Sequence, residues 1–386
     1  MHVYYISPST IPARAANSIH VVNMCEALAG LDNDVTLFVR SPLPTAKCRE
    51  ALQEFYGIDN SRIKVVAFRS RFSRGAELLI ACRALLHFMG DRLQGRAPGA
   101  IVSRNLYGAL LFGLLCRRRL VYETHAPDKG LRRLFQSRLL KSSRTPVLVI
   151  SDALRQIMAS LHGVPRQSIH VLHDAARSGQ EPLEPEEKRR ARHRLLGDRI
   201  PDDCQVVGYF GHLYAGRGIE VIQGIAARNP ATAFIVYGGN EEDIRAHKAK
   251  NQQENLHFMG HLAPGEVRLA MAMMDVLLMP YQRSVTIQGG LDTSRWMSPM
   301  KLFEYMSVGV PIISSDLPVL REVLTGQENC LLVPPDDVEA WSDALRLLAR
   351  KPDLATRISQ RAHHQYLEEY TWISRARRML VLAGGG

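Results

Sequence analysis

Residues 298–316 read SPMKLFEYMSVGVPIISSD, and their pattern indicates the class of fold. The Ser-Pro pair at its start predicts a short helix carrying Lys301 and Glu304, since proline suits the first position of a helix. The Gly-Val-Pro that follows predicts the end of this helix, and Val310–Ile313 predicts a short strand inside a parallel sheet. We therefore expect a cation and a carboxylate at a helix start beside the carboxyl edge of a sheet, where open α/β sheets bind ligands and helix N-termini hold phosphates.

Strand and helix patterns alternate on both sides of this stretch. Seven candidate strands lie between residues 2 and 172 and six between residues 206 and 333, with candidate helices between them. Such alternation indicates βαβ units and mostly parallel sheets. We predict an α/β protein of two Rossmann-like, doubly wound domains in series.

The length supports this division, because 386 residues exceed one ordinary core. Residues 178–203 combine Pro, Gly and charged residues with little apolar material, which is typical of a linker. We place the domains at residues 1–175 and 176–369. Residues 353–382 are helical and rich in Arg, and a C-terminal helix at 370–386 is expected to fold back onto the first domain.

The net charge of +11 is unevenly placed along the chain. Residues 1–175 hold 24 Lys and Arg against 12 Asp and Glu, whereas the remainder holds 25 against 26. One-sided basic charge favours nucleic acid, anionic lipid or an anionic substrate as partner, although solubility alone is the simpler explanation. No nucleic-acid motif appears, so we expect no nucleic-acid partner.

Basic runs at 69–74, 117–119 and 132–141 flank apolar helices, a combination that fits a peripheral membrane surface. For the apolar helix Ala76–Met89 itself, an ordinary core-facing helix is the favoured interpretation. No run approaches the length of a membrane-spanning helix, and the first residues are typical of a strand rather than a signal peptide. The six cysteines show neither a C-x-x-C pair nor zinc spacing, which favours buried thiols in a reduced cytosol.

Two places in the first half could carry chemistry. The loop that joins the first strand to the first helix contains Arg14 and ends in Asn17 and Ser18, which suit an N-cap; it is either an anion or acceptor site or simply a capped loop. His125 ends a strand, where it is either structural or a hydrogen-bond partner for a substrate hydroxyl. No G-x-G-x-x-G motif is present, which argues against an NAD-type domain.

A glycine-rich loop follows the first strand of the second half. Gly211, Gly216 and Gly218 would let backbone amides approach a phosphate, and Arg217 would neutralise it. Lys301 and Glu304, three residues apart on one helix face, are either a surface pair or separate ligands for a diphosphate and for a ribose diol.

At this point the sequence resembles family-4 retaining glycosyltransferases of GT-B fold, with an N-terminal segment like that of a bacterial subgroup. The resemblance rests on ordered segments that as a set are specific: GYFGHL at 208–213, RGIE at 217–220, NLHFMGHL at 255–262, MDVLLMPY at 274–281, residues 298–316, and REV at 321–323 with LLVPPD at 331–336. It covers nearly the whole chain.

The resemblance implies two domains facing a cleft, with the acceptor side on the first and the nucleotide-sugar donor on the second. It assigns the donor diphosphate to Arg217, Lys301, Gly211 and His212, the last standing where relatives often have an arginine. It gives the ribose to Glu304 and a catalytic contact with the donor sugar to His125. It also implies front-face attack, in which the departing phosphate accepts the proton of the acceptor, so that neither a protein nucleophile nor a metal or other cofactor is expected.

One departure from the family pattern is clear. The family usually has a sugar-binding glutamate eight residues before Glu304, and this chain has Trp296 there. We assign the donor-sugar region to Trp296, Asp292 and Ser298, with Arg295 and backbone amides as further candidates.

We predict an enzyme at the cytoplasmic face of the cell envelope, peripheral on the inner side of the membrane. It would move a sugar from a UDP- or GDP-linked donor to a glycan, and the charge asymmetry favours a lipid-linked acceptor in polysaccharide or glycolipid synthesis. Two alternatives stay open: a nucleotide-sugar epimerase or hydrolase of the same fold, and a catalytically degenerate glycan-binding member, which Trp296 would favour.

Overall fold

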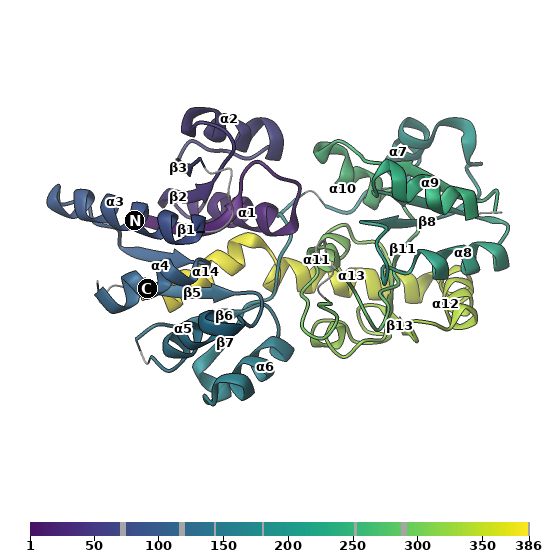
Figure 1. The fold of residues 1–386 in the computed structure, drawn as a ribbon. Coiled ribbons are helices and arrows are strands. Elements are labelled where there is room, and N and C mark those ends of the chain that lie inside the picture. Colours follow the sequence, from purple (N-terminus) through teal and green to yellow (C-terminus); the bar gives the residue numbers. More distant parts are fainter. Residues whose placement is uncertain are drawn as a thin grey trace. The chain divides into compact units, whose positions relative to one another are not determined.

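The computed structural model describes residues 1–69, 75–115, 120–142, 144–179, 181–250, 253–286 and 292–384. The chain forms two compact units: unit 1 comprises Met1–Asp174 and Thr371–Gly386, and unit 2 comprises Ala175–Tyr370. Each unit is a parallel sheet covered by helices (Figure 1).

Unit 1 has a seven-stranded sheet in the order β3-β2-β1-β4-β5-β6-β7. Its strands are β1 (His2–Thr10), β2 (Asp34–Arg40), β3 (Ile63–Phe68), β4 (Ala100–Ser103), β5 (Leu120–Thr124), β6 (Val147–Val149) and β7 (Ile169–Val171). Its helices are α1 (Ala16–Ala29), α2 (Thr45–Tyr56), α3 (Ala76–Leu93), α4 (Leu106–Leu115), α5 (Gly130–Leu140), α6 (Asp152–His162) and α14 (Trp372–Leu382), with the short 3-10 helix η1 (Arg166–Ser168).

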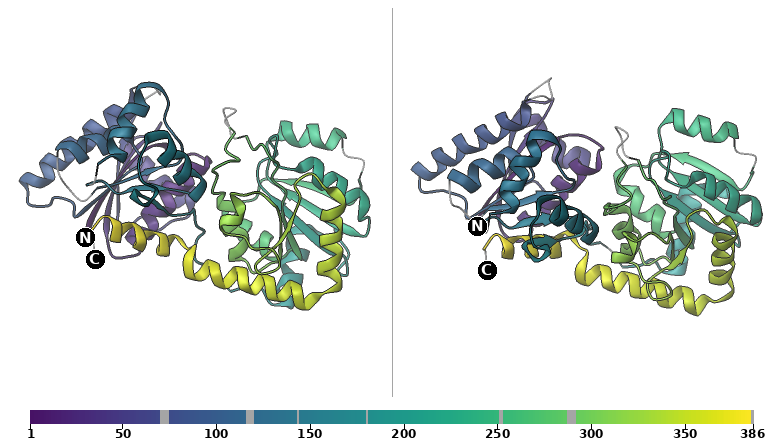
Figure 2. Two further views of the ribbon diagram at one scale, coloured as in Figure 1. Left: turned by 90° about the horizontal axis from the view of Figure 1, so that it is seen from below. Right: turned by 60° about the horizontal axis from the view of Figure 1, so that its bottom comes forward.

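The strand order fixes the layers of unit 1. Right-handed crossovers place α1 and α2 on one face of the sheet and α3 to α6 on the other. The last helix, α14, returns to unit 1 and packs against α1 (Figure 2, last yellow helix). Val3–Ile6 of β1 is completely buried, as expected for a central strand covered on both faces.

Unit 2 has a six-stranded parallel sheet in the order β10-β9-β8-β11-β12-β13. Its strands are β8 (Gln205–Phe210), β9 (Thr232–Tyr237), β10 (Leu256–Gly260), β11 (Val276–Met279), β12 (Ile312–Ser315) and β13 (Leu331–Val333). Its helices are α7 (Pro185–Leu196), α8 (Ile219–Arg228), α9 (Glu241–Lys250), α10 (Pro264–Ala272), α11 (Met300–Ser307), α12 (Val338–Arg350) and α13 (Pro352–Glu369), with the 3-10 helices η2 (Gly197–Arg199) and η3 (Leu320–Glu322).

The chain reverses direction at the centre of each sheet. In unit 2 the chain passes from β8 outward to β10 and then returns to β11 on the other side of β8. In unit 1 the same reversal separates β1 from β4. Such switch points open a crevice at the carboxyl ends of the strands, which is where open α/β sheets bind ligands.

Several local predictions are wrong. The predicted linker contains α7, which packs against α10; Lys188 of α7 pairs with Asp275 at 2.9 Å, so the segment belongs to unit 2. Helix α2 was not predicted, because half of its twelve residues are polar or charged and interrupt the apolar pattern. A further helix expected from the sequence at residues 318–324 is only the short η3. The strand predicted from Val310 begins at Ile312, after Pro311.

Two predictions about solvent contact also need correction. Cys82 is exposed and Cys204 partly exposed, so not all thiols are buried as predicted. The helix predicted to face the core, Ala76–Met89, does bury Ile80 and Phe88, but it also carries exposed leucines. Within the described residues no helix combines the length and apolarity that a membrane crossing needs. The basic residues 70–74 and 117–119 lie outside the described part of the chain.

Candidate functional site

Helix α11 presents Lys301 and Glu304 at the switch point of unit 2. Pro299 is its N-cap rather than its first helical residue, and the helix buries Leu302, Phe303, Tyr305 and Met306 against the sheet. Gly309, just past the end, has φ +66°, and a Cβ there would lie 2.6 Å from the Pro182 side chain. Glycine therefore ends the helix as predicted, because this left-handed and crowded position suits no other residue.

The Lys301 ammonium lies in a cage of aromatic rings. It is 4.1 Å from the centre of the Tyr209 ring, 4.7 Å from that of Tyr281 and 6.0 Å from that of Tyr305. Rings at these distances attract a cation through their negative faces. Burial and the Arg217 guanidinium nevertheless hold the pKa of Lys301 well below its usual range. The ammonium is thus placed where an anion would restore its charge.

Arg217 also lies beside Tyr281. Its Nη1 donates to the Tyr281 hydroxyl at 3.0 Å, and its guanidinium carbon is 5.2 Å from the Tyr281 ring centre. Its Nε is buried without a hydrogen-bond partner among the described residues. The structure therefore brings Arg217, which follows β8, together with Lys301, which follows the neighbouring β11.

Neither cation is neutralised by a carboxylate. In the described part of the chain, no Asp or Glu oxygen lies within ion-pair distance of Arg217 or Lys301. Glu304 is partly buried on the Lys301 face of α11, and burial raises its pKa while Lys301 opposes that change. Two neighbouring basic groups without an ion-paired carboxylate are the expected state of an anion site before its ligand binds.

The glycines of the loop after β8 let two loops pack closely. A Cβ on Gly216 would lie 2.0 Å from the Ser284 carbonyl oxygen, and one on Gly218 would lie 2.0 Å from that of Pro280. Both have φ near +80°. They permit close packing of two loops, which positions Arg217, and the phosphate approach proposed for them is not needed to explain them. At Gly211 a Cβ would lie 3.3 Å from the Lys301 Nζ, so this glycine leaves room for the ammonium.

His212 stacks on Tyr214 with ring centres 4.9 Å apart, and its carbonyl accepts from the Tyr209 hydroxyl at 2.7 Å. Burial, followed by Arg217, lowers its pKa, so a neutral imidazole is favoured. It borders the cation pair without adding charge.

The donor-sugar candidates lie in the loop before α11. Asp292 accepts from the amides of Val285 and Ser294 and from the Ser284 hydroxyl, and these bonds lower its pKa to about 2. Its carboxylate therefore stabilises the conformation of the loop through these hydrogen bonds. Trp296 is partly buried, Ser298 is buried and Arg295 is exposed. Residues 287–291 of the same loop lie outside the described chain.

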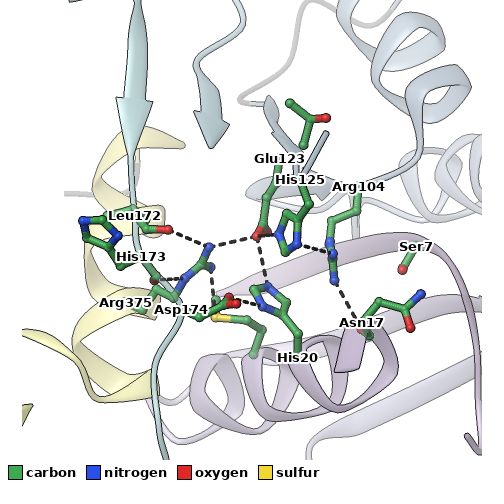
Figure 3. A network of polar contacts seen from close by, with 12 residues as sticks. Ser7, Asn17, His20, Arg104, Glu123, His125, Leu172, His173, Asp174 and Arg375 are labelled. Carbon is green, nitrogen blue, oxygen red and sulfur yellow. Dashed lines mark hydrogen bonds and ion pairs between the residues drawn. The ribbon is translucent and has the colours of Figure 1, made fainter. Parts of the chain in front are cut away.

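A buried polar network lies at the carboxyl edge of the unit 1 sheet (Figure 3). Glu123 of β5 accepts from Arg375 of α14 and from His125, both at 2.8 Å, and His20 of α1 lies 3.0 Å away. His20 also contacts Asp174 at 2.8 Å. Burial alone would raise the pKa of Glu123, but Arg375 and the histidines outweigh it and hold that pKa well below its usual range.

His125 uses both ring nitrogens inside this network. Arg104 donates to Nδ1 at 3.0 Å, so Nε2 carries the hydrogen that Glu123 accepts. Burial and then Arg104 lower the pKa of His125 to about 4. The imidazole is therefore neutral and held in one tautomer, with 24% of the side chain exposed. At neutral pH the imidazole is suited to orienting a ligand through a hydrogen bond rather than to carrying a proton.

The N-terminal loop reaches the same edge but is not capped as predicted. Ala15 is the N-cap of α1, without a side-chain cap, and Ser18 donates to the Thr10 carbonyl at 2.8 Å. The carbonyl of Asn17 accepts from Arg104 at 3.3 Å. Arg14 and Asn17 are exposed, so they stay available to a ligand, whereas Ser18 is buried.

His20, His125 and Asp174 are the group of described residues whose geometry could hold a metal ion. Their nitrogens and oxygen are already bonded to Glu123, to Arg104 and to one another, and the guanidiniums of Arg104 and Arg375 border them. A cation there would displace these bonds and meet two positive charges, so the cluster does not fit a metal site.

Sequence patterns had missed most of these partners. Tyr209, Tyr281 and Tyr305 appear in the sequence as ordinary core aromatics. Glu123 and Arg375 carried no motif, although a carboxylate within the apolar strand β5 was a usable signal, because charged residues are rarely buried unless paired.

Comparisons with known proteins agree with this architecture. Residues 204–351 match the model for glycosyl transferases group 1, and residues 18–175 match the model for glycosyltransferase family 4. The chain is 25% identical over 291 residues to a GDP-mannose-dependent alpha-(1-6)-phosphatidylinositol monomannoside mannosyltransferase of Mycolicibacterium smegmatis, covering 71% of this chain and 73% of that protein.

Two further similarities are of the same kind. A phosphatidyl-myo-inositol mannosyltransferase of Mycobacterium leprae is 32% identical over 139 residues, which are 36% of this chain and 34% of that one. The crystal structure of Anabaena HepE in complex with UDP covers both chains fully, with a TM-score of 0.74 and 16% identity.

Proposed function

The chain belongs to glycosyltransferase family 4 and has the GT-B fold, and from this premise we propose that it transfers a sugar from a nucleotide-diphosphate donor to a glycan acceptor with retention of the anomeric configuration. The observation that carries the proposal is the pair of cations around Tyr281. Arg217 and Lys301 converge at the switch point of unit 2 without a carboxylate partner in the described chain.

A diphosphate supplies what this pair lacks. Arg217 would donate from its unpartnered Nε, and the Lys301 ammonium would regain the charge that burial disfavours. Glu304, on the same helix face, would accept hydrogen bonds from the ribose hydroxyls. This division places the nucleotide along α11, and His125 keeps its proposed contact with the donor sugar.

The proposed chemistry needs no protein nucleophile. The departing diphosphate would accept the proton of the acceptor hydroxyl while the new bond forms on the same face of the sugar. Arg217 and Lys301 would stabilise the charge that develops on that diphosphate. Positioning of donor and acceptor supplies the remainder of the rate. We expect neither a metal nor another cofactor.

Binding measurements with different nucleotide sugars can identify the base and the sugar of the donor. A mycobacterial relative is named for GDP-mannose, and HepE was crystallised with UDP. A thermal-shift panel of UDP- and GDP-sugars tests the donor class, since a ligand at 100 times its Kd stabilises by about 2.7 kcal/mol. Arg217→Met and Lys301→Met should each weaken the best ligand at least about tenfold, or ~1.4 kcal/mol. Unchanged affinity in both variants would refute this site.

Turnover separates the proposed activity from its alternatives. Retention predicts that NMR of the product shows the anomeric configuration of the donor. Donor consumption without an acceptor would instead support an epimerase or hydrolase. Binding without turnover on any glycan or lipid-linked acceptor would support a degenerate binding member.

Trp296 should decide part of the donor-sugar selectivity. Trp296→Ala is expected to change the ranking of nucleotide sugars while the affinity for the free nucleoside diphosphate stays constant. An identical ranking in the variant would remove Trp296 from the sugar region.

A further inference from the structure

Helix α3 leaves most of its leucines exposed. The side chains that it buries are Ala76, Ile80, Ala81, Ala84 and Phe88. The side chains that it exposes include larger apolar ones, among them Leu86 at 68% and Leu93 at 89% exposure. A surface helix ordinarily buries its leucines, because burial of their apolar area stabilises the packing of the helix against the core. The outer face of α3 thus keeps apolar area in contact with water along about 27 Å of helix.

Helix α5 extends the same feature. Leu131 and Leu134 are 67% and 65% exposed. Seven of the ten exposed large hydrophobic residues in the described chain lie on these two helices, and we call them the leucine surface: Leu78, Leu79, Leu86, Met89, Leu93, Leu131 and Leu134. Single exposed apolar residues are ordinary, but such a concentration marks an interaction surface.

The two helices are held in one layer. Helix α4 packs against both, and all three cover the same face of the sheet (Figure 1). Glu77 at the start of α3 pairs with Arg132 of α5 at 2.7 Å. The same guanidinium lies 5.5 Å from the centre of the Tyr107 ring of α4. The leucines near the starts of α3 and α5 are therefore neighbours on one fixed surface.

The charges around the leucine surface are one-sided. Arg83 and Arg92 of α3 and Lys129, Arg138 and Lys141 at α5 are all exposed. The acidic groups nearby are engaged: Glu77 and Asp128 pair with Arg132, and Asp91 accepts from the Tyr4 hydroxyl. An apolar strip with a basic border matches the interface of an anionic lipid bilayer, in which acyl chains meet phosphate headgroups.

We propose that the leucine surface docks unit 1 onto an anionic lipid bilayer, with α3 and α5 lying in the plane of the headgroups. A second copy of the chain fits less well, because a symmetric contact would oppose the same arginines and lysines to one another. Anionic headgroups neutralise these charges instead.

The surface adjoins the polar edge of unit 1. The side-chain amide of Asn105, between Arg104 and α4, donates to the Glu77 carbonyl at 2.7 Å. The starts of α3 and α5 therefore lie beside the strand ends that carry Arg104 and His125. A lipid-linked acceptor in the docked bilayer would be held next to this edge. That last step rests on the proposed function, whereas the docking does not.

Vesicle cosedimentation of the full chain tests the docking. Wild type should bind phosphatidylcholine vesicles that contain phosphatidylglycerol at low salt, and bind pure phosphatidylcholine at least tenfold more weakly. The double variant Leu86→Gln/Leu134→Gln should lose at least tenfold in affinity, and Arg138→Gln/Lys141→Gln should lose affinity mainly at low salt. The matched controls Val381→Gln and Arg377→Gln/Arg378→Gln change exposed residues of α14 on the opposite face and should bind as wild type.

Three results would overturn the docking: no binding of wild type to anionic vesicles, unchanged binding of the leucine variant, or a wild-type dimer that the leucine variant converts to monomer. Leu93→Gln, near the end of α3, serves if the double variant does not fold. Nucleotide affinity should be the same in all of these variants, so a failed donor site and a failed membrane surface give different results.

Discussion

Arg375 donates to Glu123 at 2.8 Å although 252 positions separate them in the sequence, and both side chains are almost completely buried. Arg375 also donates to the carbonyls of His173 and Leu172. One guanidinium from the last helix thus joins the ends of β5 and β7. These hydrogen bonds attach α14 to the rest of unit 1 through polar contacts. Trp372 adds an aromatic contact, since its ring centre lies 5.0 Å from that of His20.

Arg375→Met should destabilise unit 1 by about 3–5 kcal/mol, because it leaves the Glu123 charge buried without its main partner. The measurement is urea unfolding followed by a probe specific to unit 1. Arg377→Met on the same helix is the matched control, since Arg377 is exposed, and should change stability by less than about 0.5 kcal/mol. Equal losses of unfolding free energy in the two variants would show that the buried pair does not stabilise unit 1.

A double-mutant cycle measures the interaction energy between Arg375 and Glu123 and its sign. In the double variant Arg375→Met/Glu123→Gln neither charge remains. Its loss of unfolding free energy should therefore be smaller than the sum of the losses in the two single variants. Simple additivity would mean that the two side chains do not interact energetically.

Acid should weaken unit 1 through His125. Its pKa is lowered from an ordinary value near 6.5 to about 4, so the unfolded chain binds the proton more tightly. The stability from this group is present above about pH 6.5 and is lost as the pH falls toward 4, on the order of 3 kcal/mol. The lowered pKa values of Glu123 and Asp174 add a further loss below about pH 4.

The variant His125→Asn isolates this contribution. The difference in unfolding free energy between wild type and variant should shrink as the pH falls from about 6.5 to about 4. A difference that stays constant with pH would contradict the lowered pKa of His125.

The fold was largely predictable because its signals are local. A helix was predicted at Ala76–Met89 and is observed as α3, Ala76–Leu93, and seven and six parallel strands follow from apolar runs spaced by helices. The Lys301 and Glu304 pair was predictable for the same reason, since three residues along a helix determine a common face.

What could not be predicted depends on contacts distant in sequence. No pattern connects Arg375 to Glu123. Which apolar residues of α3 are buried could not be predicted, because its sequence has apolar residues on both sides and only packing shows that most of the leucines stay exposed. The rings of Tyr209 and Tyr281 come together around Lys301 only when β8 and β11 pair.

Nucleotide-sugar binding should depend on pH through Lys301. Its pKa in the free protein is held well below the usual range by burial and by Arg217, and a bound diphosphate would raise it. Binding therefore takes up a proton wherever the free amine is deprotonated, so the affinity should fall as the pH rises through the lowered pKa of Lys301. The diphosphate of a nucleotide sugar does not itself titrate near neutral pH.

Isothermal titration in buffers of different ionisation enthalpy measures this proton uptake directly. Lys301→Met should abolish it and flatten the pH dependence, whereas Lys248→Met, an exposed lysine of α9 in the same unit, should behave as wild type. Proton uptake that persists in Lys301→Met would assign the effect to another group.

Gly218→Ala should damage the donor site without touching a charge. Gly218 has φ +82°, which costs an alanine about 1–2 kcal/mol, and the new Cβ would lie 2.0 Å from the Pro280 carbonyl oxygen. The two loops must move apart, and Arg217 would lose its contact with Tyr281. Nucleotide affinity should therefore fall together with stability. Gly265→Ala is the matched control, since nothing lies within 4 Å of its Cβ position and it sits inside helix α10. If Gly218→Ala bound the nucleotide as tightly as Gly265→Ala, the close packing of these loops would not be what holds Arg217 in place.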